Sequence, residues 1–131
     1  MMLEGGCHCR AVRYRVSGET AHVALCHCID CRRHAGAPTV CWAAVKGDQL
    51  EVEGKLTTYA SSEHGRRQFC PVCGTGLFYL NEAALPGLVD IQAGTLDDPE
   101  AMPPALHIQT AERLNYMTRL DDLPAFERYP G

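Results

Sequence analysis

The sequence of 131 residues lacks long apolar segments, basic stretches and any apolar leader near its start. Its longest apolar run, Val40–Val45, is far shorter than the roughly 20 residues of a membrane-spanning helix. Lys and Arg number 12 against 16 Asp and Glu, a formal net charge of -4, so a nucleic-acid-binding surface is not indicated. Because the first residues do not resemble a signal peptide, we expect a cytoplasmic protein that binds neither nucleic acid nor membrane.

Linkers and low-complexity segments are also missing, and the length suits a single domain over residues 1–131. Helical character is confined to Ile29–Ala35, which Gly36 and Pro38 close. Turn residues recur about every ten positions and separate short segments with strand patterns. The predicted strands are Ala11–Val16, Thr39–Val45, Leu50–Glu53, Thr57–Ala60, Gly76–Leu80 and Val89–Ala93. We therefore predict a mostly β fold, a small split sheet or sandwich with one short helix.

The eight cysteines are the most informative residues in the sequence. Seven of them form three tight clusters, and only Cys41 stands alone. Disulfide frameworks belong mainly to secreted proteins, whereas cysteines with one or two intervening residues are typical of metal sites. The spacing therefore favours bound metal, which would also staple the small β domain together. The clusters are Cys7/Cys9, Cys26/Cys28/Cys31 and Cys70/Cys73.

Two of the clusters can combine into one closed site. Cys70 and Cys73 form a knuckle in which Pro71 presets a turn and Gly74 can adopt a positive φ. A knuckle supplies two thiolates of a tetrahedral zinc site and needs two more from elsewhere. The pair Cys7 and Cys9 would complete it. We predict a structural zinc held by these four thiolates, whose binding energy becomes folding energy.

The remaining cluster offers three ligands and leaves one position open. Cys26 and Cys28 share a face on a strand, and Cys28 and Cys31 share a face on a helix. A strand that passes into a helix at Cys28 would therefore aim the three sulfurs at one point. Three protein ligands with an open position are typical of catalytic zinc. The alternatives for a fourth ligand are His27, His34 and Cys41.

Three residues beside this cluster are candidate catalytic or binding residues. Arg32 and Arg33 would offset the negative charge of the thiolates or hold a carboxylate of the ligand. His34 has a suitable pKa for proton transfer. An equally open interpretation of each arginine is a solvated helix residue.

Several segments, taken in order, resemble one family. The sequence is similar to the glutathione-dependent formaldehyde-activating enzymes, a family that includes centromere protein V. The tail at 107–129 also looks like the end of family members, and it adds His107 and Arg113 as weaker candidates. The segments that carry the resemblance are GGCHCRAVRY at 5–14, CHCIDCRRHAG at 26–36, FCPVCGTGL at 69–77 and IQAGTLDDPE at 91–100.

The resemblance implies a mostly β fold with a split sheet and two zinc ions per chain. It implies that Cys7, Cys9, Cys70 and Cys73 hold a structural zinc, and that Cys26, Cys28 and Cys31 hold a labile one. The implied activity joins glutathione to formaldehyde as S-(hydroxymethyl)glutathione, and is classed as a carbon–sulfur lyase for the reverse direction.

Three hypotheses about function follow from these observations. The first is a zinc enzyme in which a small thiol such as glutathione is activated at the open position and attacks an aldehyde. The second is a non-catalytic zinc module that binds protein partners. The third is a redox or zinc sensor whose three-cysteine cluster releases metal on oxidation. The sequence indicates no oligomeric state.

Overall fold

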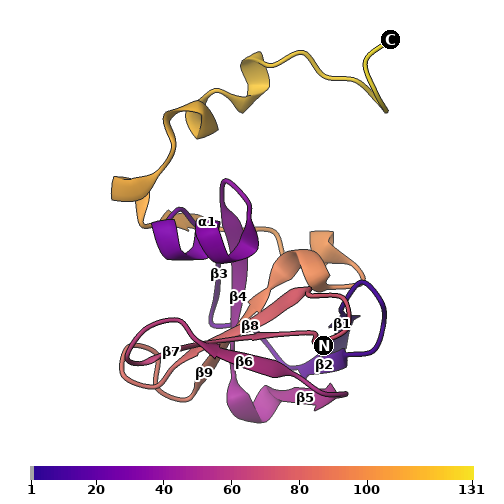
Figure 1. Cartoon of the computed structure of the whole chain (residues 1–131), viewed down its shortest axis with the longest axis vertical. Helices are drawn as coiled ribbons and strands as arrows, with labels where there is room; N and C mark the ends of the chain where they lie inside the picture. Colours follow the sequence, from indigo (N-terminus) through magenta and orange to yellow (C-terminus); the bar gives the residue numbers. More distant parts are fainter. Residues whose placement is uncertain (1) are drawn as a thin grey trace.

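The computed structural model describes residues 2–131 and consists of two β-sheets, one α-helix and several 3₁₀ turns (Figure 1). The prediction of a mostly β fold with one short helix is confirmed. The strands are β1 (Met2–Gly6), β2 (Arg13–Ser17), β3 (His22–Cys26), β4 (Val40–Lys46), β5 (Leu50–Glu53), β6 (Thr57–Ala60), β7 (Gly65–Phe69), β8 (Gly76–Asn81), β9 (Leu88–Gln92) and β10 (Leu106–Ile108). The helix is α1 (Ile29–Ala35), and the 3₁₀ turns are η1 (Gly47–Gln49), η2 (Ala93–Thr95), η3 (Pro99–Ala101), η4 (Thr110–Glu112), η5 (Asn115–Thr118) and η6 (Leu120–Asp122).

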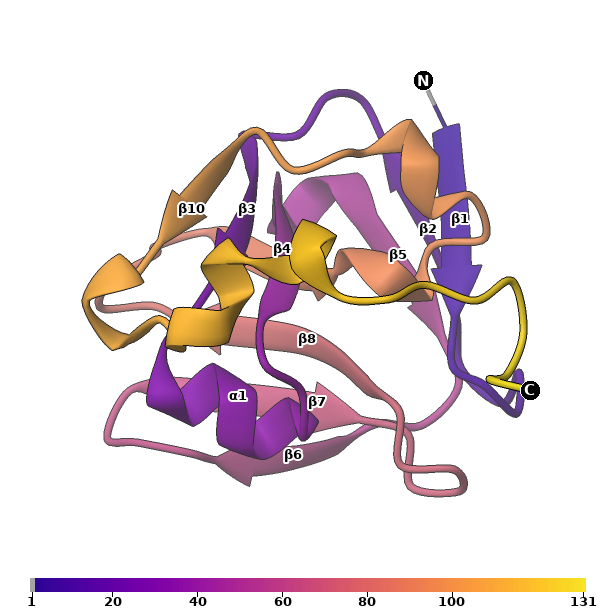
Figure 2. The ribbon, with the colours of Figure 1, turned by 90° about the horizontal axis from the view of Figure 1, so that it is seen from above.

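The strands form one small and one large sheet. The small sheet has the antiparallel order β1-β2-β5, and the large one has the order β10-β3-β4-β9-β8-β7-β6. Only β10 runs parallel to its neighbour, β3; the other pairs of the large sheet are antiparallel. Figure 2 shows α1 crossing one side of the large sheet, with β10 beside β3.

The main core joins the two sheets. Tyr14 and Val16 alternate with exposed residues on β2, so this strand presents one apolar face to the interior. The Tyr14 ring meets Phe78 of β8 edge to face, with ring centroids 5.4 Å apart. Cys7 and Cys70 belong to the same buried cluster. Two of the predicted zinc ligands are therefore anchored directly in the core.

Helix α1 begins and ends as the sequence predicts. Cys28 is its N-cap residue, and the cap Gly36 adopts φ 66°, the left-handed conformation that glycine tolerates at helix ends. The backbone N–H of Gly36 donates to the carbonyl of Arg32 at 2.8 Å. The strand-to-helix passage at Cys28, on which the three-sulfur prediction depends, is therefore present.

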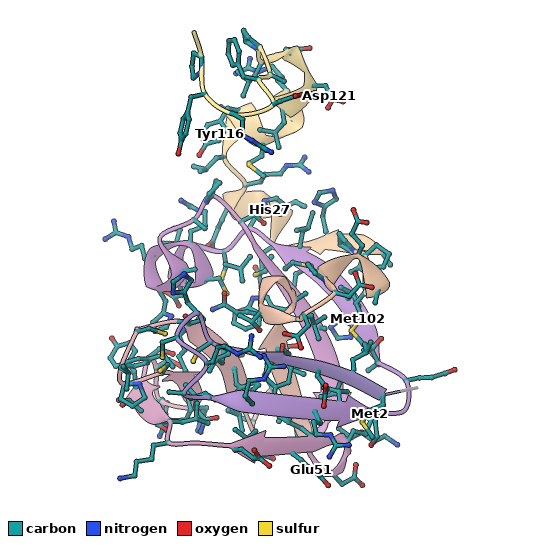
Figure 3. The ribbon with its side chains drawn as sticks, turned by 90° about the vertical axis from the view of Figure 1, so that its right-hand side faces the viewer. Met2, His27, Glu51, Met102, Tyr116 and Asp121 are labelled. Carbon is teal, nitrogen blue, oxygen red and sulfur yellow. The ribbon has the colours of Figure 1, made fainter. Side chains whose placement is uncertain are left out.

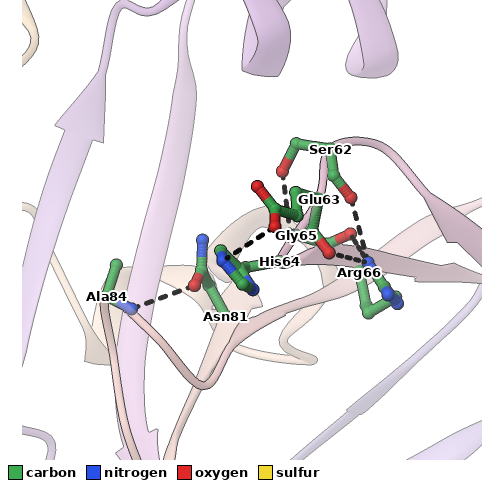
Figure 4. Close-up of polar contacts among 7 residues, drawn as sticks. All are labelled: Ser62, Glu63, His64, Gly65, Arg66, Asn81 and Ala84. Atoms are coloured by element: carbon green, nitrogen blue, oxygen red, sulfur yellow. Dashed lines mark hydrogen bonds and ion pairs between the residues drawn. The ribbon is translucent and has the colours of Figure 1, made fainter.

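Strands β6 and β7 are joined by a tight turn that sets the register of β7 (Figure 4). The hydroxyl of Ser62 accepts a hydrogen bond from the backbone N–H of Gly65 at 2.9 Å. The Arg66 side chain donates to the carbonyl of Ser62 at 3.0 Å. With this register Arg66 is exposed and its neighbour Arg67 is buried. The turn thus leaves Arg66 at the surface and directs Arg67 into the protein interior.

The C-terminal tail projects from the body beyond α1 (Figures 1 and 3). Tyr116 and Asp121 lie on this segment, far from Met2 and Glu51 on the sheets (Figure 3). In the described chain, residues from 114 onward form hydrogen bonds with other residues of the tail. None of the helices in residues 2–131 combines the length and apolar character needed to cross a membrane.

Candidate metal centres and active site

The closed cluster forms where two distant turns meet. Cys7 and Cys9 lie on the turn after β1, and Cys70 and Cys73 lie on the turn between β7 and β8. The chain turns at the first pair, with a hydrogen bond from the Arg10 N–H to the Cys7 carbonyl at 3.1 Å and a φ of 70° at Arg10.

The sulfur geometry of this cluster fits one zinc ion. The four sulfurs lie within 4.8 Å of one another. Cys9 Sγ is 3.6 Å from Cys7 Sγ and 3.8 Å from Cys70 Sγ. Four sulfurs bound to zinc at about 2.3 Å in a tetrahedron are separated by about 3.8 Å, whereas a disulfide needs about 2.05 Å. The donor set therefore suits zinc, and the distances exclude disulfides.

Backbone and side-chain donors surround three sulfurs of this cluster. The backbone N–H of Val12 donates to Cys7 Sγ at 3.2 Å, and that of Val72 donates to Cys70 Sγ at 3.4 Å. The hydrogen bond with the Thr75 hydroxyl lowers the pKa of Cys73 to about 5. Gly74 takes the predicted positive φ, 81°. The contacts to Cys7 and Cys73 lower the pKa of each thiol and so favour the deprotonated sulfur that a metal ion requires.

The three-cysteine cluster forms where β3 passes into α1. Cys26 ends β3, Cys28 caps the helix and Cys31 lies in its first turn. The N–H of Cys31 donates to Cys28 Sγ at 3.2 Å, and Cys26 Sγ lies 3.7 Å from Cys31 Sγ. The three sulfurs lie within 4.8 Å of one another, as the spacing predicted. This separation again fits the edge of a zinc tetrahedron of about 3.8 Å.

Within residues 2–131, the His, Cys, Asp and Glu side chains add no fourth donor to this cluster. His34 instead stacks on Tyr59, with centroids 6.0 Å apart. Cys41 lies on β4 and packs against the main core. His27 is fully buried, and its Nε2 lies 2.8 Å from Nδ1 of His107. The arrangement is therefore a three-thiol set with one side free of protein ligands.

A cavity of about 570 Å³ opens beside these three cysteines, between α1 and one face of the large sheet. A volume of this order suits a small-molecule ligand. Trp42 and Tyr79 form an aromatic wall, with ring centroids 6.1 Å apart. The residues that line the cavity are Cys26, Cys28, Ile29, Asp30, Cys31, Trp42, Arg67, Tyr79, Ala84, Leu85, Asp90, Ile108, Gln109 and Glu112.

Arg67 is a cation of this site that the sequence analysis did not identify. Both terminal nitrogens of its guanidinium lie near Cys31 Sγ, at 3.8 and 3.7 Å, and the group lies 4.7 Å from the centroid of the Tyr79 ring. Arg67 is only 5% exposed and, among the described residues, forms no ion pair with a carboxylate. Hydrogen bonding with Cys26 and the charge of Arg67 lower the pKa of Cys31 to about 5, against the effect of burial. The Cys31 thiolate is thus the counterion of Arg67.

The three predicted candidates beside the cluster have different surroundings. Arg32 donates to the carbonyls of His27 and Glu112, at 3.2 and 3.3 Å, and so ties α1 to the start of the tail. Arg33 and His34 line a neighbouring cavity of about 350 Å³, which Arg67 also borders. Their catalytic role stays a prediction.

The weaker candidates His107 and Arg113 lie next to His27. Burial lowers the pKa of His27, and the nearby charges of His107, Arg113 and Arg32 add to this effect. His27 is therefore neutral at physiological pH, and its contact with His107 joins β10 to the cysteine loop. Neither His107 nor Arg113 lines the cavity beside the three cysteines.

The sequence and the site agree with one family. The family model described as glutathione-dependent formaldehyde-activating enzyme matches residues 2–112. The chain therefore belongs to this family, as the cysteine motifs predicted. The match ends before most of the tail, so it does not test the likeness of residues 113–129.

Individual relatives are similar over part of the chain. An uncharacterized lyase of Schizosaccharomyces pombe is 30% identical over 76 residues, which cover 58% of this chain and 56% of that protein. The chain thus spans little more than half of that relative. A putative glutathione-dependent formaldehyde-activating enzyme of Halomonas elongata is 34% identical, with 79% of this chain and 71% of that protein covered. A crystal structure of a Rhodobacter sphaeroides protein shares the fold, with a TM-score of 0.61, 24% identity and coverage of 79% of this chain and 98% of that chain.

We expect fresh, reduced protein to contain about two zinc ions per chain, because the two cysteine groups each suit one. A chelator should remove one ion faster, since the three-cysteine group adjoins an open cavity and contributes fewer ligands. Elemental analysis and chelator kinetics would measure this. A single zinc per chain, or two ions lost at one rate, would contradict the division into two kinds of site.

Proposed function

We propose that this protein is a zinc-dependent carbon–sulfur lyase that interconverts a small thiol plus formaldehyde and the corresponding S-hydroxymethyl thiol. Glutathione is the thiol that the family name supports. In the reaction the sulfur–hydrogen bond breaks, a carbon–sulfur bond forms, and the aldehyde oxygen gains the proton. The observation that carries the proposal is a three-thiol set, free of a fourth protein ligand, that lines a cavity of ligand size in a member of this family.

The residues fit two zinc ions with different roles. Cys7, Cys9, Cys70 and Cys73 would hold the structural ion, and Cys26, Cys28 and Cys31 would hold the second one. When bound at the second group, zinc supplies a positive charge that lowers the pKa of a thiol.

The residues around the cavity bind and orient the reactants. Arg67 offsets the negative charge of the thiolates, which otherwise disfavours the approach of another anion. Trp42 and Tyr79 exclude water from one side of the site. Arg33, which lines the neighbouring cavity together with His34, would hold a carboxylate of a peptide thiol such as glutathione.

The test is a rate measurement, because thiols add to formaldehyde without a catalyst. NMR exchange spectroscopy on glutathione and formaldehyde would report the interconversion directly. The exchange rate should rise in proportion to the concentration of zinc-loaded protein. We expect an acceleration of at least about 10²-fold over the uncatalysed exchange, a magnitude typical of positioned acid–base groups.

The matched control is Cys28→Ser, which removes one sulfur from the second group only. This variant should lose the acceleration and the binding of glutathione in calorimetry while it stays folded. If the native protein accelerates exchange with neither glutathione nor other small thiols, and binds none of them, the non-catalytic module becomes the better account.

A further inference from the structure

Asp90 is a buried carboxylate for which residues 2–131 supply no hydrogen-bond or ion-pair partner to its Oδ1. It lies on β9, is 8% exposed, and its Oδ1 is fully buried without a hydrogen bond. Among residues 2–131, no cation lies within ion-pair distance of it. Burial of an unpaired carboxylate is costly, so such a group in a folded protein needs an explanation.

The strand register places Asp90 in the candidate active site. Arg67 of β7 lies opposite Tyr79 of β8, and Tyr79 lies opposite Asp90 of β9. Residues directly opposite one another share a face of the sheet, and all three line the cavity beside the three cysteines. Arg67 of this row contacts Cys31 of α1, while Asp90 has no counterion among the described residues.

Among the described residues, Asp90 is neither a candidate metal ligand nor a counterion, the two structural roles that would explain its burial. It is not a member of the donor groups that could hold a metal ion. It is also not the counterion of Arg67 or of another described residue. An unpaired carboxylate that adjoins a cavity of ligand size is available to a ligand.

We propose that Asp90 is the catalytic residue that carries the proton between the thiol and the aldehyde oxygen. The inference rests on the proposed carbon–sulfur lyase function. The Asp90 carboxylate takes the proton of the entering thiol, the carbon–sulfur bond forms as the carbonyl π bond breaks, and the new oxyanion receives that proton from Asp90. In the reverse direction Asp90 takes the hydroxyl proton, the carbonyl π bond re-forms as the carbon–sulfur bond breaks, and Asp90 returns the proton to the released thiolate. Neither direction consumes a net proton.

The surroundings of Asp90 suit both the uptake and the release of this proton. Burial raises the pKa of Asp90 to about 6, so acid and base forms are both accessible near neutral pH. The charge of His22 on β3 opposes this shift and a negative charge on Cys31 of α1 adds to it. The other charged or titratable groups on the same cavity are the thiols of Cys26 and Cys28, Arg67 and Tyr79 on the sheet, and the exposed Asp30 and Glu112.

The test compares Asp90→Asn with Asp48→Asn, the same chemical change at an exposed position on η1. We expect Asp90→Asn to lower kcat by about 10²-fold with little change in KM, and to remove the increase in rate as pH rises through about 6. The melting temperature should rise by several degrees at pH 8 and by less at pH 5, because only the ionised form of Asp90 is penalised by burial. Zinc content should stay unchanged.

A second variant distinguishes a catalytic role of Asp90 from a purely structural one. Asp90→Ala should be inactive and regain part of its kcat when formate is added, since a small carboxylate can enter the space that the side chain leaves. Native kcat and pH dependence in Asp90→Asn, or loss of zinc and stability without formate rescue in Asp90→Ala, would overturn the role of Asp90 alone. Absence of turnover in the native protein would instead overturn the proposed function and this inference with it.

Discussion

Replacing Cys70 with Ser will destabilise the protein far more than replacing Cys28 with Ser. Cys70 is fully buried in the main core, and its cluster joins segments about sixty residues apart, as in the 61-residue separation of Cys9 and Cys70. Structural zinc supplies folding energy on the order of 10 kcal/mol in small domains, so loss of one ligand should cost at least about 3 kcal/mol. Urea unfolding at matched zinc content would measure the difference.

Cys28→Ser should change the free energy of unfolding by less than about 1 kcal/mol, because Ser is itself a favourable N-cap residue. The hydroxyl can accept the hydrogen bond from the Cys31 N–H that Cys28 Sγ now accepts. The three-cysteine group also spans only a strand end and one helical turn, so it constrains little chain. Equal destabilisation by the two substitutions would show that the groups do not divide into a structural and a functional site.

Replacing Arg67 with Gln will weaken zinc binding by the three-cysteine group about 10–100-fold, the usual effect of removing a partner of a metal ligand. The guanidinium is buried against Cys31 Sγ and stacks on Tyr79, so its charge is poorly screened there. Three thiolates and one Zn²⁺ leave a net charge of -1, which Arg67 offsets. Titration with a competing chromogenic chelator would give both affinities in one experiment.

Arg66→Gln is the matched control, because Arg66 precedes Arg67 on β7 and is exposed. It should leave both zinc affinities unchanged, and Arg67→Gln should spare the four-cysteine site. If the two variants behave alike, or if Arg67→Gln weakens both sites equally, then Arg67 contributes general stability and not the electrostatics of the second site.

The local parts of both cysteine groups could be predicted because they depend on short segments. Helix α1 occupies the predicted residues, since the N-cap at Cys28 and the glycine at 36 are local signals. The cysteine spacing also predicted the two groups in which the sulfurs lie together in space. The strands β5 and β6 match their predicted bounds, whereas β1, β3, β7 and β10 were not predicted. β1 and β7 contain glycines and charges, β10 has only three residues, and the sequence HVALC of β3 does not alternate between apolar and polar residues.

The sequence by itself determined the family, the mostly β class and the two cysteine groups, because motif spacing and turn residues act over a few positions. Only the tertiary structure decided that Arg67 and Asp90 belong to the site. The segments GRRQF and LVDIQ do not show which polar side chain is buried, since this depends on pairing between β7, β8 and β9. A shift of one residue in that register would turn both side chains to the opposite face. Strand pairing joins residues far apart in the chain. It places Arg67 beside the Cys31 sulfur and leaves Asp90 without a partner among the described residues.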